Sequence, residues 1–272
     1  MFEFFHDKSV ELNNYNFYQC YSEEEQRNVE ISQAIEKLDG GEQFVFYDLS
    51  ISKIEQQLIS KLEVTDFNQS IINVLNSSDG IKLNQEIYKA IELMNSIQIN
   101  SDETSILSKL ITRIASAITG QSGAKYFELI IRTRDSYDDG CTFWHLDKNQ
   151  AEIDNKNFDY QQNDYQEKRF IVPLKGAGTI YHKMNDTVRE NFLKVAEEAP
   201  YYYGHVLDGC HLDDEISKLF DIKDAEVTKE GHGAVHIAGS RGAVHAAPKS
   251  SSNRLILLIT DLEKRITYNL TR

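Results

Sequence analysis

Two short segments, whose histidines are 100 positions apart, constrain the fold of this chain more than any other feature. The first reads Trp144-His145-Leu146-Asp147 and the second Gly242-Ala243-Val244-His245. His145 and Asp147 are two positions apart, and residues i and i+2 of a β-strand point to the same face of a sheet. The pair can therefore aim an imidazole and a carboxylate into the interior of a β-barrel, where His245 could join them.

Taken alone, His-x-Asp is a weak signal, because a buried histidine bonded to a neighbouring aspartate is a common structural pairing. The chain also contains a second copy, His211-Leu212-Asp213. There Asp213 begins an expected helix over residues 213–220, and capping of a helix N-terminus explains an aspartate at that place. We therefore favour His145 and Asp147, which lie on an expected strand.

The surroundings of His245 strengthen this interpretation. Small residues flank it, and Arg254 follows nine positions later at the start of an apolar strand over residues 254–261. We expect this strand to run antiparallel to the one that carries His245, so that Arg254 projects into the same cavity. A buried arginine suits a carboxylate ligand held by two hydrogen bonds. The alternative is a protein carboxylate, since the chain has 43 acidic residues.

The first half of the chain carries apolar residues mainly at helical spacing. The clearest example is the segment 103–119, where Ser101 or Asp102 can cap the start and Gly120 can end the helix. Residues 44–47 form a short apolar run typical of a strand. Helices are expected over residues 22–38, 51–62, 68–75, 84–97 and 103–119.

After Gly123 the pattern changes to short apolar runs separated by glycine and polar turns. The polar segment 149–166 is expected to be a long surface loop. Strands are expected over 126–132, 142–145, 169–174, 179–181, 233–238, 242–245 and 254–261, with helices over 187–198 and 213–220. This layout predicts an α+β protein with a small β-barrel or jelly roll against which a helical N-terminal half packs.

Composition excludes several function classes. The 272 residues carry a formal net charge of −14, which argues against general binding of nucleic acids or anionic membranes. The longest apolar run, over residues 255–260, is too short for a membrane span. The N-terminus lacks a basic start followed by an apolar run, so no secretory signal is expected. Cys20, Cys141 and Cys210 predict free thiols in a reducing cytoplasm.

The motifs together resemble the Fe(II)/2-oxoglutarate-dependent dioxygenase superfamily. The resemblance depends on Trp-His-x-Asp on one strand, then Gly-Ala-Val-His, then an arginine nine residues later. Residues 139–147, 169–170, 175–179 and 242–245 are similar to a bacterial branch of that superfamily catalogued as a domain of unknown function. The second half of the chain carries these motifs, and the first half is similar only in its helical layout.

The resemblance implies a double-stranded β-helix core over residues 123–272, with an insertion near 187–229, and a helical region over residues 1–122. It implies His145, Asp147 and His245 as Fe(II) ligands and Arg254 as the partner of the 2-oxoglutarate C5 carboxylate. Many members place Ser or Thr two residues after this arginine, where this chain has Ile256. Tyr181 and Thr179 are candidates for the missing carboxylate contact.

The resulting hypothesis is an iron- and 2-oxoglutarate-dependent oxygenase that hydroxylates a small molecule or a protein side chain. Tyrosine-rich segments near 149–166 and 200–211 would flank the mouth of the cavity. Two other classes stay open: a non-catalytic metal- or ligand-binding jelly roll, and an acidic interaction protein. Among the remaining histidines, His236 is expected to support the site or the core. His232 also lies close to His245 in the sequence, and His6, His182 and His205 are expected to be structural or exposed.

Overall fold

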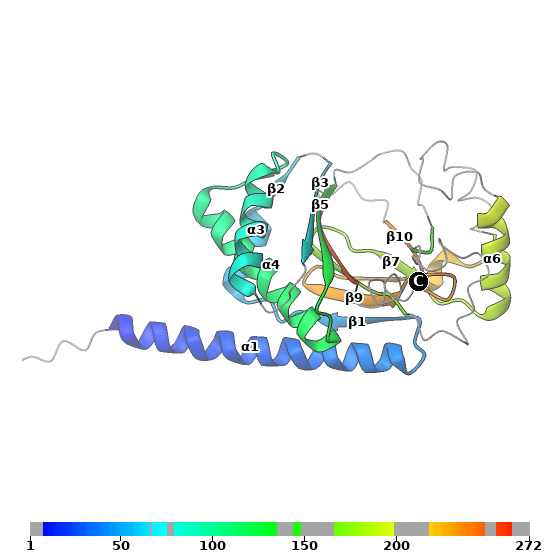
Figure 1. Ribbon diagram of the computed structural model, residues 1–272, viewed down its shortest axis with the longest axis horizontal. Helices are drawn as coiled ribbons and strands as arrows, with labels where there is room; N and C mark the ends of the chain where they lie inside the picture. The colour runs from blue at the N-terminus through cyan, green and yellow to red at the C-terminus, as the bar shows by residue number, and fades with distance from the viewer. Residues whose placement is uncertain are drawn as a thin grey trace, which may run out of the picture.

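The computed structural model describes residues 8–65, 67–74, 79–134, 144–147, 166–198, 218–247 and 254–262. Its centre is a six-stranded sheet with the order β1-β9-β6-β11-β5-β3, in which every neighbouring pair is antiparallel (Figure 1). The strands are β1 (Phe44–Asp48), β3 (Asn68–Val74), β5 (Phe127–Arg134), β6 (Lys168–Lys175), β9 (His232–Ile237) and β11 (Arg254–Asp261).

A second sheet has the order β10-β7-β8, formed by β7 (Ile180–His182), β8 (Glu226–Val227) and β10 (Val244–Ala246). An isolated antiparallel bridge joins His145 to His245 on β10, with reciprocal backbone hydrogen bonds of 2.9 and 3.0 Å. The segment 144–147 therefore extends this smaller sheet next to β10. A third, two-stranded sheet pairs β2 (Glu63–Val64) with β4 (Ile97–Gln98).

Consecutive segments alternate between the two main sheets. The chain passes from β5 in the larger sheet to segment 144–147 in the smaller one, then to β6 in the larger and to β7 and β8 in the smaller. It returns to the larger sheet at β9, crosses to the smaller at β10 and comes back to the larger at β11. Residues far apart in sequence are thus brought to one space between the sheets.

Four helices cover the opposite face of the six-stranded sheet: α1 (Lys8–Asp39), α2 (Lys53–Lys61), α3 (Gly80–Leu93) and α4 (Ser101–Ser122) (Figure 1). Apolar side chains from these helices and from alternate positions of the sheet form the largest buried cluster. Asn100, with a capping box to Glu103, begins α4, and Gly123 in the left-handed conformation ends it. The expected caps at Ser101 or Asp102 and at Gly120 are therefore wrong by one to three residues.

The helix predicted over residues 68–75 is wrong, because residues 68–74 form β3. Ile72 and Val74 are buried while Ile71 and Asn73 are exposed, which is the two-residue alternation of a strand. The run is too short for helical and strand periodicity to be told apart from spacing alone. Pairing with β5 and the β-branched residues of the segment favour the strand.

Most other expected elements within the described residues are confirmed with end shifts of one to four residues, including α6 (Asp186–Glu198). The helix expected over residues 22–38 is an exception, because α1 begins 14 residues earlier, at Lys8. The expected helix at 213–220 and the loop at 149–166 lie largely outside the described residues. The proposed division at residue 122 stays a prediction, although β1 and β3, which precede it, are strands of the main sheet. In the part of the chain that the structure describes, no helix is long and apolar enough to cross a membrane.

A smaller cluster of buried side chains lies between the two sheets. It includes Phe44 on β1, Ile171 on β6, Ala234 on β9, Ile256 on β11 and Tyr181 on β7. These positions alternate with the residues that face the helices, so the six-stranded sheet is apolar on both faces. The space between the sheets is where the polar residues of the predicted site are found.

Candidate metal site

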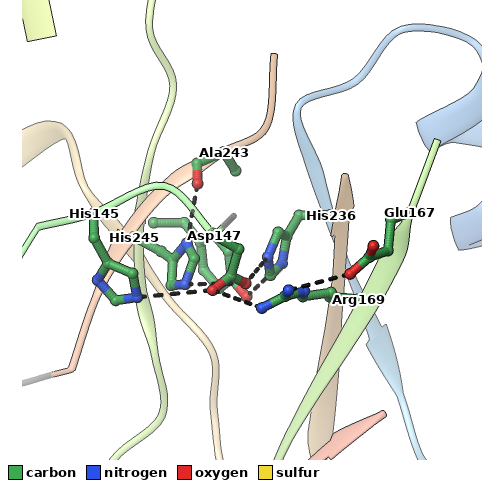
Figure 2. A network of polar contacts seen from close by, with 8 residues as sticks. His145, Asp147, Glu167, Arg169, His236, Ala243 and His245 are labelled. Carbon is green, nitrogen blue, oxygen red and sulfur yellow. Dashed lines mark hydrogen bonds and ion pairs between the residues drawn. The ribbon is translucent and has the colours of Figure 1, made fainter. Parts of the chain in front are cut away.

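The structure brings His145, Asp147 and His245 together. Each offers one ligand atom, and these three atoms lie within 4.8 Å of one another. His145 Nε2 lies 4.0 Å from Asp147 Oδ1, and His245 Nε2 lies 3.6 Å from Asp147 Oδ2. Figure 2 shows the two imidazoles on one side of the carboxylate. Two imidazole nitrogens and one carboxylate oxygen are the donor set that suits non-haem Fe(II) and leaves coordination positions open.

The spacing fits a metal after a small closure. Ligand atoms about 2.1 Å from one ion and at right angles are about 3 Å apart. The two distances to Asp147 therefore have to shorten by about 1 Å or less. The side chain of His145, 46% exposed, has room to make this movement. Asp147 and His245, with 13% and 4% exposed side chains, form the fixed part of the site.

The ring of His245 is oriented by its own backbone neighbourhood. Its Nδ1 lies 3.0 Å from the carbonyl oxygen of Ala243, to which it can donate. A neutral ring protonated at Nδ1 presents the lone pair of Nε2, and Nε2 is the atom that faces Asp147. Metal-binding histidines are commonly held in this way, because the second nitrogen donates to a carbonyl or a carboxylate.

Asp147 is bonded on its other side to His236 and Arg169 (Figure 2). His236 Nε2 lies 2.8 Å from Oδ2, and an Arg169 terminal nitrogen lies 3.0 Å from Oδ1. The backbone carbonyl of Asp147 accepts a 2.7 Å bond from the N–H of Gly239. Each carboxylate oxygen keeps a lone pair beyond these bonds. The aspartate is therefore held in place while still able to bind a cation.

The electrostatics of the site favour the protonation states that a metal requires. Burial raises the pKa of Asp147, but His245, the hydrogen bond from His236 and the charge of Arg169 together hold that pKa well below its usual range. Burial and the neighbouring His145 lower the pKa of His245 well below its usual value, outweighing Asp147. A carboxylate and a neutral imidazole are the forms that bind metals.

Gly242 explains part of the motif before His245. A Cβ at this position would overlap the backbone oxygen of Ile237, so a larger residue would displace the turn between β9 and β10. Arg189 on α6 donates to the carbonyl oxygens of Ser240 and Gly242 and secures the same turn. The glycine thus allows the close approach that places β10, and with it His245, next to segment 144–147.

Trp144 does not line the site. Its neighbour His145 faces the site, so Trp144 points to the other side of the smaller sheet, where it packs against Phe220 at 5.0 Å between ring centroids. Met184 and Phe192 belong to the same cluster. The apolar residue before Trp144, Phe143, lies outside the described residues.

The apolar wall of the site comes from Tyr181 instead. Its ring is fully buried and stacks on His245 at 5.4 Å and on Phe44 at 4.9 Å between centroids. Its hydroxyl lies 3.2 Å from Nδ1 of His236. The structure therefore places Tyr181 beside His236 and His245. Its assignment to a cosubstrate carboxylate stays a prediction.

Arg254 lies further along the sheet. Its side chain is buried on the face of β11 that also carries Ile256, and its Nε donates to the carbonyl oxygen of Ala177. The strands that carry Arg254 and His245 belong to different sheets, because β11 pairs with β5 and β6 while β10 pairs with β7. Thr179 lies two positions after Ala177 in the sequence, and its backbone carbonyl accepts a hydrogen bond from the backbone N–H of Thr228.

Three residues of the polar network around Asp147 were not predicted in these roles. His236 was assigned only to a supporting or core role, and Arg169 and Glu167 were not assigned to the site. The two charged residues are spaced two positions apart where the chain enters β6, so they share one face of the strand. The charged run over residues 167–169, directly before the apolar residues of β6, is the signal that could have indicated them. The His211 and Asp213 copy lies outside the described residues.

Comparison with known proteins gives matches among solved structures only. No family model and no curated protein matches the chain. One similar structure is a prolyl-4-hydroxylase of Pseudomonas putida, at 10% identity and a TM-score of 0.35, covering 85% of this chain and 98% of that one. Another is a 2OG-Fe(II) family oxidoreductase of Burkholderia pseudomallei, at 11% identity and a TM-score of 0.34, covering 86% and 88%.

A third similar structure is a prolyl hydroxylase of Trichoplax adhaerens in complex with a hypoxia inducible factor peptide. It is 10% identical, with a TM-score of 0.38, and the match covers 92% of this chain and 96% of that one. All three TM-scores are below 0.5. The function proposed below therefore depends on the geometry of the site and not on these matches.

Proposed function

We propose that this protein is an Fe(II)- and 2-oxoglutarate-dependent oxygenase, with His145, Asp147 and His245 as the iron ligands. The observation that carries the proposal is the convergence of the two imidazole nitrogens on the Asp147 carboxylate, from segments 100 positions apart. The alternation of segments between the two sheets supports a double-stranded β-helix core, since jelly rolls are built from two such sheets.

The protein's own contribution is to position the reactants and to exclude water. When bound, iron and 2-oxoglutarate would supply the oxidising chemistry. Asp147 and His245 are already in the charge states that bind a cation, and Ala243 orients the His245 ring. The buried ring of Tyr181 closes the site from the apolar side. Exposed His145 leaves the opposite side open for a substrate.

Arg254 is the proposed anchor for the C5 carboxylate of 2-oxoglutarate. It is 4% exposed and lies on the face of β11 that faces the smaller sheet. Its Nε donates to the carbonyl oxygen of Ala177, which orients the guanidinium. A buried guanidinium is the group best suited to hold a carboxylate by two hydrogen bonds. Thr179 remains a proposed additional contact, and Tyr181 is the other, provided that its hydroxyl turns from His236 to the carboxylate when the cosubstrate binds. The substrate would be a small molecule or a protein side chain.

The decisive experiment measures Fe(II)-dependent conversion of 2-oxoglutarate to succinate by the anaerobically prepared, iron-loaded protein after admission of air. We expect turnover without added substrate to be slow and to disappear in His245→Ala. Anaerobic calorimetry with Fe(II) followed by 2-oxoglutarate tests binding separately. If the folded protein binds neither Fe(II) nor 2-oxoglutarate, the proposal is wrong.

A non-catalytic metal-binding jelly roll is the second candidate. The exposure of His145, the ligand furthest from its partner at 4.0 Å, favours it, because a loosely held third ligand weakens control of a reactive ion. This candidate predicts binding of Fe(II) or Co(II) with no effect of 2-oxoglutarate on the affinity and no succinate. The same calorimetric titration therefore separates the two functions.

A further inference from the structure

Glu167 is a buried carboxylate that lies two residues before Arg169 and away from the three proposed ligands. Its side chain is 0% exposed, and one of its oxygens lies 3.1 Å from a terminal nitrogen of Arg169. Its backbone carbonyl accepts a 2.8 Å hydrogen bond from Ala238. A carboxylate buried so completely is costly unless it is paired. Arg169 is the partner that the structure gives to Glu167.

Arg169 joins Glu167 to the metal site. One terminal nitrogen contacts Asp147 and the other contacts Glu167, so the guanidinium bridges two carboxylates (Figure 2). An arginine side chain is always charged in proteins. Paired with Asp147 alone, it would cancel the charge of the one anionic ligand. With Glu167 included, the three groups carry one net negative charge.

His236, the second hydrogen-bond donor to Asp147, can orient the carboxylate without cancelling its charge. A neutral His236 that donates from Nε2 to Asp147 can accept the hydroxyl proton of Tyr181 at Nδ1, and both contacts are present at 2.8 and 3.2 Å. Of the two groups that fix the carboxylate, Arg169 is therefore the one that carries a permanent charge, and this is the charge that Glu167 offsets.

We propose that Glu167 is a charge-balancing residue of the metal site, which offsets Arg169 so that Asp147 can hold a divalent cation with its full negative charge. The inference rests on the proposed function, because it requires a metal at the three ligands. Charges a few ångströms apart interact strongly in an interior of low effective dielectric constant. Residues beyond the ligands change metal affinity by about 10–100-fold.

The test is a series of variants that changes this net charge stepwise, with Co(II) as the probe. Glu167→Gln removes the charge, keeps the shape and keeps an oxygen that can accept from Arg169. Arg169→Gln leaves both carboxylates charged, and the double variant Glu167→Gln/Arg169→Gln restores one net negative charge. Calorimetry gives the Co(II) affinity of each, and the visible spectrum at saturation reports whether the ligand set is unchanged.

We expect Glu167→Gln to weaken Co(II) binding by about 10–100-fold with an unchanged Co(II) spectrum. The double variant should recover affinity toward that of the unmodified protein, and Arg169→Gln should bind more tightly than the double variant. Glu55→Gln is the matched control, because Glu55 is another buried acid and pairs with Arg113 in the helical layer. It should lower thermal stability and leave the Co(II) affinity unchanged.

Each outcome is informative. If the unmodified protein does not bind Co(II) or Fe(II), the proposed function itself fails. If it binds Co(II) and Glu167→Gln binds equally well, the inference about Glu167 is overturned while the metal site stands. Equal weakening in Glu167→Gln and in the double variant would assign a structural role and also overturn it. Should Glu167→Gln not fold, the comparison of Arg169→Gln with the double variant tests the same charge.

Discussion

His236 lies closer to Asp147 than either histidine of the proposed metal site. Its Nε2 is 2.8 Å from Oδ2, whereas His245 Nε2 is 3.6 Å and His145 Nε2 is 4.0 Å from the carboxylate. A hydrogen-bonded pair has the shorter distance, and two ligands that share an ion need not touch. The geometry therefore indicates that His236 supports the carboxylate while the other two histidines face the metal position.

The first prediction separates these roles. His236→Gln should weaken Co(II) binding by about 10–100-fold, because the partner that fixes Asp147 is altered while the ligands remain. His245→Gln should cause a larger loss and should change the Co(II) spectrum. Calorimetry and visible absorption of both variants measure this order. If His236→Gln changes the spectrum and His245→Gln does not, His236 is the ligand and the assignment has to be exchanged.

The second prediction concerns Arg254. Arg254→Gln should leave Fe(II) affinity unchanged within about threefold and should weaken 2-oxoglutarate binding to the iron-loaded protein, since truncating one partner of a buried ion pair costs about 2–5 kcal/mol. Anaerobic calorimetry with each ligand in turn measures both. Arg254→Lys keeps the charge but loses the planar fork of the guanidinium. Its 2-oxoglutarate affinity should therefore lie between that of the unmodified protein and that of Arg254→Gln.

A contrary result for Arg254 would have a clear meaning. If both variants bind 2-oxoglutarate normally and are less stable to heat, Arg254 has a structural role only. Its contact with Ala177 and its place in β11 would then serve to stabilise the fold. The anchor would then have to be sought elsewhere on the inner face of the sheet, where Arg132 on β5 lies opposite Ile256 on β11.

Local sequence pattern predicted most elements and the residues that come together at the site. The spacing of His145 and Asp147 was sufficient to predict that both would face one side, because alternation is a property of the strand itself. Which distant strands pair with each other could not be predicted from local sequence pattern. Whether β11 pairs with β10 or with β5 depends on contacts across the whole chain, and so does the choice of strand for residues 68–74.

The ion pairs of Arg169 with Asp147 and Glu167 could not be predicted from local sequence pattern either. Arg169 is a charged residue in a strand whose alternate positions are apolar, which marks it as unusual, but nothing in its neighbourhood names its partners. Those partners are Asp147, which is 22 positions earlier, and Glu167, and the bridge exists because segment 144–147 and β6 meet at the same place.

The third prediction concerns the contact between Gly233 and Tyr47, which lie opposite each other on β9 and β1. A Cβ at residue 233 would overlap the ring of Tyr47, so the aromatic side chain covers the space that the glycine leaves. Gly233→Ala should destabilise the protein by about 1–3 kcal/mol, the usual cost of overpacking. Urea unfolding followed by circular dichroism measures the difference.

Relief of the overlap is the control for Gly233→Ala. In the background Tyr47→Leu, where the ring is absent, the additional change Gly233→Ala should cost less than it does alone, which gives a coupling free energy of about 0.5–3 kcal/mol. Additive effects would show that the cost comes from the backbone of β9 and not from the ring of Tyr47.

The last prediction follows from the hydroxyl of Tyr47, which is buried and has no hydrogen-bond partner among the described residues. Burial raises the pKa of Tyr47 far above its usual value, so the folded protein keeps this proton where the unfolded chain releases it near pH 10. The stability that Tyr47 contributes is therefore complete below about pH 10 and is lost as the pH rises further, by up to about 1.4 kcal/mol per pH unit. Tyr47→Phe removes the ionisable group and should reduce the fall in unfolding free energy between pH 10 and pH 11.

Because the hydroxyl of Tyr47 has no partner among the described residues, Tyr47→Phe should be as stable as the unmodified protein at pH 8, or more stable by about 1 kcal/mol. Urea unfolding at pH 8, 10 and 11 measures both effects, and a variant that is less stable at pH 8 with the same alkaline slope would contradict both.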